Sequence, residues 1–516
     1  MKYRIYFIPL SIFVLLNLFV IFNYGYYHDD WGFFNFNNES FFEHSKNIWL
    51  TEGVELHRYP NVIFYLLASA LPNKELLYFS LAVFGFIICW QIYDILNFIL
   101  KKKNISTDIN RFGLLSLISV WYFFPFNIGG QIWSADLHVK VSMLFFLIHY
   151  QFLIRQKILK SLIFLLIAFS SYEMFYLIYI PLSSLIYFLG IIEKNFFKKY
   201  LFYSLIIQIY FIFDRKRDEY EFELLVFIQR NIFNIYRFFY SIYSSLISFL
   251  SIYAQIIIFS PLIYFIYKID KKKTFFKILI ILVVTLGLNS LILAGGHYGF
   301  TGQGVFSRSF YYAAFCIFLF SFLLFILSQK KIKYLIILYF ISFGVTSFYF
   351  ESKSWIKSWE IQKEVFTNNK INYIEKKFGK DNLIFFFGPC KYNGVEVFYA
   401  PWDIGRSILE NNPSSQNDYT VLTDWNLEFD QEKKIIGVHN FHYSYRLKDF
   451  NNVILWDYFK DKISFVKSTR NFTFDDLKHF NNLHDYRSCE IRSTKYEKNL
   501  INYKEFYELF INFKIT

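Results

Sequence analysis

The chain has 516 residues, of which 55% are hydrophobic and 23% aromatic, and its formal net charge at pH 7 is +13. Apolar runs of about 20 residues recur as far as residue 350, and each is long enough to cross a hydrocarbon core roughly 30 Å thick. This composition excludes a purely soluble globular protein and indicates a polytopic α-helical membrane protein.

We expect eleven transmembrane helices. No small-residue cleavage pattern follows the first segment, so we interpret it as a retained anchor and not as a signal peptide. The apolar stretch at residues 60–71 is too short to cross, and it predicts a re-entrant or interfacial helix. The predicted spans are residues 4–24, 75–99, 112–126, 136–154, 158–172, 174–192, 200–213, 240–267, 275–294, 309–328 and 334–350.

The positive charge is unequally divided between the two sides of these spans. With the N-terminus inside, the inner segments carry 20 Lys and Arg residues against three acids, whereas the outer loops carry 10 cations and 14 acids. This is the positive-inside pattern of membrane proteins, so the net charge does not indicate a nucleic-acid partner. We therefore expect a multi-pass protein of the cell inner (plasma) membrane, with a cytoplasmic N-terminus.

Composition changes near residue 350, which divides the chain into a transmembrane domain (1–350) and a C-terminal α/β domain (351–516) on the periplasmic or extracellular side. An amphipathic helix is expected to begin at Trp355 and to run to Lys377, and a helix-rich ending to begin at Asp475. Turn signals separate short β-like runs, which predict strands at residues 383–387, 395–399, 419–422, 453–456 and 463–466.

The four cysteines are of two kinds. Cys89 and Cys316 lie inside apolar spans, where a thiol packs as a small hydrophobic group. Cys390 and Cys489 both lie in the polar C-terminal region, and an oxidising outer compartment would allow them to form a disulfide. Closure of so long a loop would stabilise the domain by on the order of 4 kcal/mol.

Two adjacent carboxylates, Asp29 and Asp30, follow the first span directly and open the outer loop 25–74, which also holds Arg58. Carboxylates at the mouth of a membrane span are costly unless they are solvated, paired or used in function. A solvated pair at a helix end is the alternative. We interpret Asp29 and Asp30 as candidate catalytic or metal-binding residues.

Further polar residues fall on the same predicted side. Asp136 lies at the second outer turn beside His138, Glu173 at the third, and His297 and Arg308 flank a glycine-rich fifth turn. Each has an ordinary alternative, such as a helix cap, a structural ion pair, a loop residue or a cation that reaches lipid headgroups. The glycine-rich turn is not a nucleotide-binding P-loop, because no Gly-Lys-Ser/Thr follows it.

A resemblance to a known family rests on Asp29 and Asp30 after the first span, the turn at 171–173, Arg308 before a late span, and an outer C-terminal domain. On these features, residues 1–350 resemble the C-type (GT-C) membrane glycosyltransferases, especially the bacterial cell-envelope branch with GtrII-like enzymes. The C-terminal domain resembles no family. The resemblance implies transfer of a sugar from a polyprenyl-phosphate donor to a cell-envelope glycan or lipid acceptor, by inverting displacement on the outer face.

The residues suit this chemistry. Asp29 or Asp30, with Asp30 favoured, would act as general base, because a carboxylate near a membrane can have a pKa raised toward neutrality. Arg308 or Arg58 would bind the lipid phosphate. Glu173, Asp136 and His297 complete the expected substrate-binding set. A divalent cation, Mg²⁺ or Mn²⁺, on the Asp pair is left open, and no other cofactor is expected.

Two other functions remain as alternatives. A transporter or flippase of lipid-linked sugars would show internal pseudo-symmetry and helices broken near the membrane midplane, and the sequence shows neither pattern. An O-antigen-type polymerase would favour a large outer loop between late spans over a C-terminal domain. In each case the partners are lipid-linked sugars and membrane lipids, and not nucleic acid.

Overall fold

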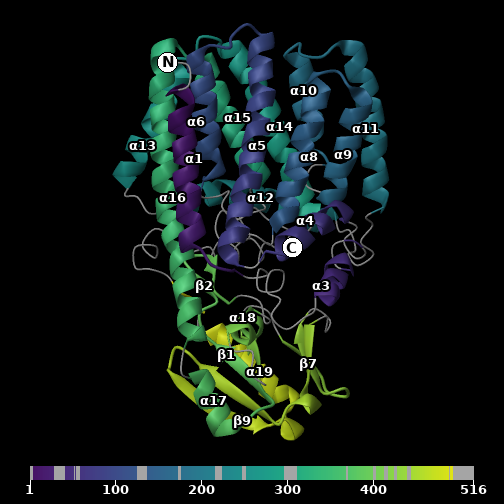
Figure 1. Ribbon diagram of the computed structural model, residues 1–516, viewed down its shortest axis with the longest axis vertical. Coiled ribbons are helices and arrows are strands. Elements are labelled where there is room, and N and C mark those ends of the chain that lie inside the picture. Colours follow the sequence, from purple (N-terminus) through teal and green to yellow (C-terminus); the bar gives the residue numbers. More distant parts are fainter. Residues whose placement is uncertain are drawn as a thin grey trace.

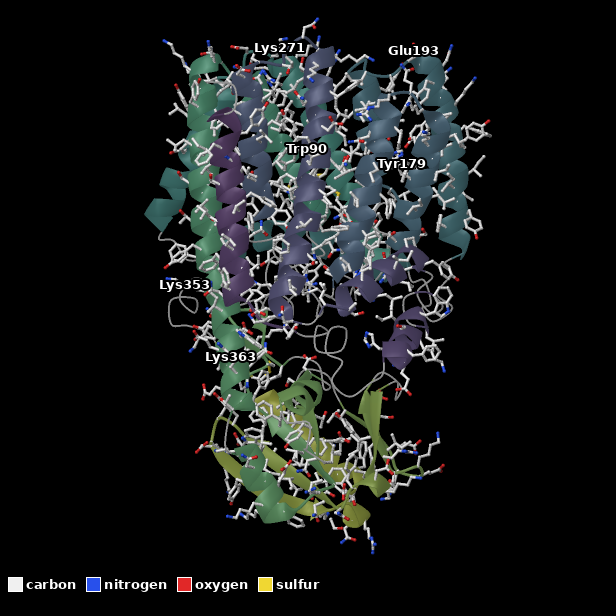
Figure 2. The ribbon with its side chains drawn as sticks, in the orientation of Figure 1. Trp90, Tyr179, Glu193, Lys271, Lys353 and Lys363 are labelled. Atoms are coloured by element: carbon white, nitrogen blue, oxygen red, sulfur yellow. A yellow bond between two sulfur atoms is a disulfide. The ribbon has the colours of Figure 1, made fainter. Side chains whose placement is uncertain are left out.

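A helical bundle is joined to a smaller α/β domain, and helix α16 (Lys330–Phe366) runs through both (Figure 1). We call the end of the bundle nearest the α/β domain the domain end, and the opposite end the far end. Figure 2 places Lys271 and Glu193 at the far end, and Lys353 and Lys363 on the part of α16 that leads into the domain. The computed structural model describes residues 4–27, 41–50, 53, 58–71, 73–124, 136–172, 176–214, 224–246, 252–295, 311–367, 370–398, 403–411, 417–422, 427–438, 443–486 and 489–491.

The bundle consists of helices of very different length. Among the described residues, five helical stretches are long and apolar enough to cross a membrane, namely α1, α5, α8, α14 and the stretch that contains α16. Three more apolar helices, α9, α10 and α15, are shorter. The chain is therefore a helical, membrane-associated protein with a strand-containing C-terminal region. The helices are α1 (Arg4–Asn23), α3 (Phe41–Ile48), α4 (Tyr59–Ser69), α5 (Lys74–Lys102), α6 (Asp108–Tyr122), α8 (Leu137–Ile154), α9 (Ile158–Ser171), α10 (Tyr179–Phe188), α11 (Lys194–Asp214), α12 (Leu224–Leu246), α13 (Ile252–Tyr267), α14 (Lys272–Gly295), α15 (Tyr311–Leu327) and α16.

The single span predicted at 240–267 is wrong, because two helices, α12 and α13, occupy this region. Helix α12 is amphipathic, and its polar side chains are used in packing. Asn234 Nδ2 donates to the Ser290 carbonyl (3.4 Å), and Ser290 Oγ donates to Asn231 Oδ1 (3.2 Å). Hydrogen bonds between helices satisfy polar groups that lipid could not, so α12 is held against α14 by its polar face.

The prediction that a helix begins at Trp355 is also wrong, because Trp355 lies within a longer helix. Helix α16 continues without interruption from Lys330 to Phe366, and a separate helix, α17 (Lys370–Phe378), follows. No proline interrupts this stretch, and its one glycine, Gly344, lies in contact with Val120 of α6. Nothing therefore ends the helix at residue 350. The short helix predicted at 60–71 is confirmed as the 11-residue helix α4.

The C-terminal domain contains a four-stranded sheet in the order β4-β1-β8-β9, in which the first three strands are parallel and β9 is antiparallel to β8. Four of the five predicted strands are confirmed, whereas in the fifth, predicted at 395–399, only the first two of the described residues 395–398 form a strand. The β5–β6–β7 sheet was not predicted. The strands are β1 (Asn382–Phe387), β2 (Lys391–Tyr392), β3 (Val395–Glu396), β4 (Asp418–Val421), β5 (Glu428–Asp430), β6 (Ile435–Val438), β7 (Tyr443–Arg446), β8 (Asn452–Asp457), β9 (Lys462–Ser468) and β10 (Glu490–Ile491), and the helices that follow α17 are α18 (Asp403–Asn411) and α19 (Phe474–Tyr486).

Strand β1 is buried on both faces of this sheet. Ile384 and Phe386 pack in one cluster with residues of α16, α17 and α18, whereas Phe385 packs on the other side with Phe472 and with Phe480 of α19. A central parallel strand covered on both faces carries a continuous apolar run, and this is why residues 383–387 were recognisable in the sequence.

The carboxyl end of β1 lies on the side of the domain nearest the bundle. It leads into β2 and β3, where Asn393 Nδ2 donates to Ser354 Oγ (3.4 Å) and Ser358 Oγ donates to the Glu396 carbonyl, so both strands contact α16. The predicted disulfide is confirmed here. Cys390 and Cys489 are bonded, with Cα atoms 5.3 Å apart, and they join β2 to the chain at β10.

Candidate functional site

The structure describes two of the seven predicted site residues, Arg58 and Asp136. The other five, Asp29, Asp30, Glu173, His297 and Arg308, lie outside the described residues, so their roles stay predictions. Arg58 and Asp136 come from loops that are distant in the sequence, and the fold brings them into one cluster.

This cluster consists of Arg58, Tyr65, Asp136, His138 and Tyr172, and we call it the Tyr172 cluster. The Arg58 guanidinium carbon lies 5.1 Å from the centre of the Tyr172 ring, and the Tyr172 and His138 rings meet edge to face at 4.6 Å. His138 Nε2 lies 3.4 Å from Asp136 Oδ1, and His138 Nδ1 lies 3.1 Å from the Tyr65 hydroxyl. The imidazole is thus in contact with a carboxylate on one side and a phenol on the other.

Three helix ends position these side chains. Arg58 is the residue before α4, whose first turn contains Pro60, a residue favoured at the start of a helix. Asp136 precedes α8, and Tyr172 follows α9. Asn61 Nδ2 donates to the Ser171 carbonyl (3.0 Å), and this hydrogen bond holds α4 against the end of α9. Figure 1 shows α4 at the domain end of the bundle.

The ionisable side chains Asp136, Arg58 and His138 of the Tyr172 cluster are almost completely removed from solvent. Asp136 has no exposed surface, and Arg58 and His138 are 8% and 5% exposed. Lys140, which follows Asp136 by four residues and therefore lies on the same face of α8, is also fully buried. Buried charges are costly unless they are paired or used, and ionisable groups within a membrane-spanning bundle are functional-site candidates by default.

The alternative role of Asp136, that of a helix cap, does not fit its geometry. Asp136 occupies the cap position of α8, but its side chain makes no capping hydrogen bond to the backbone. Its carboxylate instead faces His138. A carboxylate beside one imidazole nitrogen and a phenol beside the other fix the orientation of the ring. The group is therefore built to hold His138 in place.

Sequence reasoning missed part of this cluster. His138 was expected to be a loop residue, whereas it lies in the first turn of α8 and is buried. Tyr65 is one of 42 tyrosines and carries no signal that separates it from those that face lipid. Tyr172 stands next to Glu173 in a turn that was noticed for its acid. Only the packing of α4 against α8 and α9 brings these rings to the cluster.

Metal binding stays a prediction about the Asp pair. Within the part of the chain that the structure describes, no group of three or more His, Cys, Asp and Glu side chains is placed to hold a metal ion. The Tyr172 cluster itself offers one carboxylate and one imidazole, which is too few for a closed metal site. We therefore assign no step of the chemistry to a cation.

Comparison of the chain with protein-family models, with curated proteins and with solved structures gives no match. The resemblance to C-type glycosyltransferases thus depends on the short motifs and the helical architecture described above.

Proposed function

We propose that the protein transfers a sugar from a polyprenyl-phosphate donor to a cell-envelope glycan or lipid acceptor on the outer face of the membrane, and that it belongs to the C-type glycosyltransferases. The observation that carries the proposal is the buried Tyr172 cluster at the domain end, where Arg58 and an imidazole held by a carboxylate both contact the Tyr172 ring. A lipid phosphate needs a cation near the membrane surface, and the transfer of a hydroxyl proton needs an acid–base group nearby.

The proposed topology has a cytoplasmic N-terminus and an outer C-terminal domain. The lysines of residues 101–103, 268–273 and 330–333 all lie at or next to loops of the far end, opposite the α/β domain. Lysine-rich loops remain on the cytoplasmic side of a membrane. The domain end, with the Tyr172 cluster, is then the outer end, where a lipid-linked sugar would be used without a nucleotide.

In this mechanism an acceptor hydroxyl oxygen attacks the anomeric carbon of the donor sugar, and Asp29 or Asp30 takes the hydroxyl proton. The bond between the anomeric carbon and the phosphate oxygen breaks, the electron pair leaves with polyprenyl phosphate, and the anomeric centre is inverted. Arg58 would stabilise the leaving phosphate, because contact with the Tyr172 ring restrains the guanidinium. His138, oriented by Asp136, would hold a donor hydroxyl or relay a proton.

The chain just before the Asp pair is firmly placed. The Tyr24 ring stacks on Trp355 with ring centres 5.7 Å apart, and the Tyr27 hydroxyl donates to the Trp355 carbonyl (2.8 Å). The Tyr78 hydroxyl donates to the Gly25 carbonyl (2.6 Å). Residues 24–27 are therefore fixed against α5 and α16 at the domain end. A catalytic group needs such rigid support, and this supports a role for the acids that follow.

The test measures loss of labelled sugar from a polyprenyl-phosphate donor in membranes that contain the protein. We expect one of Asp29→Asn and Asp30→Asn to lower transfer by about 10²-fold, the usual scale for loss of a general base, while donor binding is retained. Glu360→Gln is the matched control, because Glu360 is an exposed acid on α16 whose ion-pair partner among the described residues is Lys357.

If both Asn variants transfer sugar at the parental rate, the acid pair is structural and the proposal is wrong. Movement of the intact donor across the membrane without loss of its sugar would instead indicate a flippase.

A further inference from the structure

A long apolar groove lies between α5, α8, α10, α14 and α15, in the half of the bundle nearer the far end. Its volume is about 420 Å³, within the range of roughly 300–1,000 Å³ that is usual for ligand sites. Leucine, isoleucine and phenylalanine form nearly all of its walls. The polar residues that line it are only Lys103, Tyr150, Lys271 and Thr274.

The groove has the depth of one membrane leaflet. Its lining residues extend along α5 from Ile92 to Lys103 and along α14 from Leu282 to Lys271. Each stretch covers eleven residue steps, and a rise of 1.5 Å per residue gives about 17 Å. This is roughly half of a 30 Å hydrocarbon core, so the groove has the length of a lipid chain from one leaflet.

Two lysines stand at the mouth of the groove. Lys103 ends the α5 wall and Lys271 the α14 wall, and Figure 2 shows Lys271 at the far end of the bundle. Neighbouring lysines are engaged with protein groups, since Lys102 Nζ donates to the Ile191 carbonyl (2.6 Å) and Lys333 Nζ donates to Asn110 Oδ1 (2.7 Å). Within the described residues, neither Lys103 nor Lys271 has a side-chain hydrogen bond or ion pair.

We propose that this groove binds an anionic phospholipid, with one acyl chain along the apolar walls and its phosphate between Lys103 and Lys271. Basic pockets between transmembrane helices on the lysine-rich side bind anionic headgroups, and hydrocarbon walls of leaflet depth fit an acyl chain. A water-soluble metabolite would find almost no polar partners there. A zwitterionic lipid is disfavoured, because it would place its own positively charged ammonium beside two lysines.

This site is independent of the proposed glycosyltransferase reaction. Leu147 and Tyr150 of α8 line the groove, and they follow His138 by nine and twelve residues, or roughly 14 and 18 Å along the helix. The groove therefore lies toward the far end, where Lys271 lines it, whereas the Tyr172 cluster lies at the domain end. The phospholipid is bound in the leaflet opposite the one where the donor would react.

The test uses the full chain in nanodiscs of equimolar phosphatidylglycerol and phosphatidylcholine, followed by native mass spectrometry of the lipids that remain bound. The parent protein should retain one phosphatidylglycerol in preference to phosphatidylcholine. Loss of two surface lysines near an anionic lipid weakens binding by roughly 30-fold, so the Lys103→Gln/Lys271→Gln variant should lose this lipid. The control is Lys198→Gln/Lys199→Gln, which removes the same charge from the exposed start of α11 and should retain it.

A second variant fills the groove without a change of charge. Leu319→Trp should exclude phosphatidylglycerol while both lysines remain, and size-exclusion chromatography verifies that this variant is folded. Equal retention of both lipids by the parent, or equal losses in the test and control lysine variants, would overturn the proposal. Displacement of phosphatidylglycerol by added polyprenyl phosphate would also overturn it, because the groove would then bind donor-type lipids.

Discussion

His138 and Asp476 show how single side chains acquire their role from neighbours that the sequence does not place beside them. His138 is held by Tyr65 of α4 and by Asp136, which occupies a cap position without capping the helix. Asp476 is held by the strand before its own helix. In each case, the residue type indicated a possible contact, and the packing of distant elements decided which contact is made.

The Tyr65 hydroxyl provides a direct test of the Tyr172 cluster. Tyr65→Phe keeps the ring and leaves His138 Nδ1, in a buried site, without the hydroxyl that lies 3.1 Å away. Loss of one partner of a buried hydrogen bond destabilises a protein by roughly 1–3 kcal/mol. We expect a lower thermal unfolding temperature in detergent. Tyr203→Phe, at an exposed position on α11, should leave this temperature unchanged. Similar shifts in both variants would contradict the assignment.

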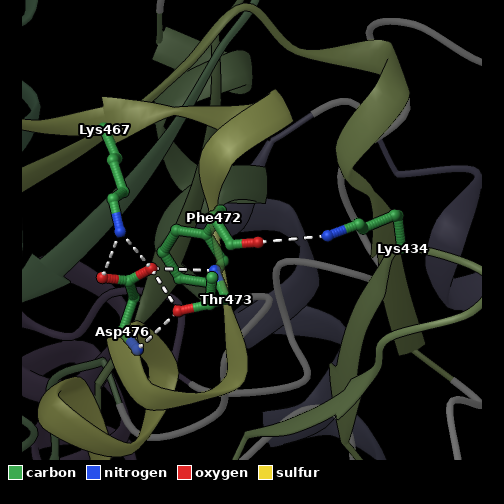
Figure 3. Close-up of polar contacts among 5 residues, drawn as sticks. All are labelled: Lys434, Lys467, Phe472, Thr473 and Asp476. Carbon is green, nitrogen blue, oxygen red and sulfur yellow. Dashed lines mark hydrogen bonds and ion pairs between the residues drawn. The ribbon is translucent and has the colours of Figure 1, made fainter.

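Asp476 forms a capping box at the start of α19 (Figure 3). Its carboxylate accepts from the Thr473 backbone N–H (2.8 Å), from the Thr473 hydroxyl (2.7 Å) and from Lys467 Nζ (2.9 Å), while its own N–H donates to Thr473 Oγ1 (3.4 Å). Burial alone would raise the pKa of Asp476, but the hydrogen bonds from Thr473 and Lys467 outweigh it and hold the pKa below its usual range. Reciprocal bonds of this kind stabilise a helix end.

The sign of the pH dependence follows from this lowered pKa. Ionised Asp476 favours the folded helix, so its contribution is present above the unfolded pKa near 4 and is lost as the pH falls through the lower folded value. Asp476→Asn should weaken the α19 cap by about 1 kcal/mol at pH 7 and by less in acid. Hydrogen exchange of the α19 amides in the intact protein measures this, with the exposed neighbour Asp475→Asn as control. An equal effect of both variants at pH 7 would show that the cap does not depend on Asp476.

At the scale of elements, α6 is the helix on which the bundle converges. Tyr122 lies over Gly85 of α5, Gly113 faces Phe325 of α15, and Val120 lies over Gly344 of α16. A Cβ at any of these three glycines would overlap the facing side chain. Small residues let transmembrane helices approach closely, and here two glycines on neighbouring helices and one on α6 itself lie at its contacts.

The contact of Val120 with Gly344 can be tested with a matched glycine. Gly344→Val forces extra volume against buried Val120, and overpacking of this kind destabilises by roughly 1–3 kcal/mol. Gly287→Val introduces the same side chain on α14, where nothing lies within 4 Å of the added Cβ. Thermal unfolding in detergent should therefore shift downward for Gly344→Val and little for Gly287→Val. Equal shifts would mean that helix propensity, and not packing, sets the effect.

Hydrophobic patterns in the sequence predicted the elements whose structure depends on neighbouring residues in the chain. Strand β1 was predictable because burial on both faces requires a continuous apolar run. Helix α4 was predictable because its apolar stretch is too short to cross a membrane. The β5–β6–β7 sheet was missed because its strands have only three or four residues. The division of 240–267 into α12 and α13 was missed because α12 uses Asn231 and Asn234 to pack against α14.

The candidate site was predictable only in part, for the same reason. Counting spans placed Arg58 and Asp136 on one side of the membrane, and the fold brings them together through Tyr172 and His138. The spacing of residues in the sequence could not predict that the Tyr172 and His138 rings join the cluster, because the contact between α4 and the ends of α8 and α9 is long-range. Residues 29, 30, 173, 297 and 308 remain predictions from sequence.

For the whole molecule, the continuous helix α16 fixes the C-terminal domain to the bundle. Trp355 on this helix contacts Tyr24 and Tyr27, and one turn further Ser358 binds the Glu396 carbonyl of β3. The same helix thus holds residues 24–27 and strand β3, which lies beyond the carboxyl end of β1. Ligands of open α/β sheets bind at the carboxyl ends of the strands, so under the proposed function this is where the domain would hold an acceptor.

The disulfide allows the proposed topology to be tested by thiol labelling. Cys390 and Cys489 are bonded across 99 residues, whereas Cys89 and Cys316 are free and buried. Structural disulfides persist outside the reducing cytosol, so a domain on the outer side should keep this bond in living cells. Alkylation after denaturation should therefore label four thiols when the protein is first reduced and two thiols when it is not. Four labelled thiols without reduction, together with cytoplasmic behaviour of a reporter after Thr516, would place the domain inside and reverse the assignment of both ends of the bundle.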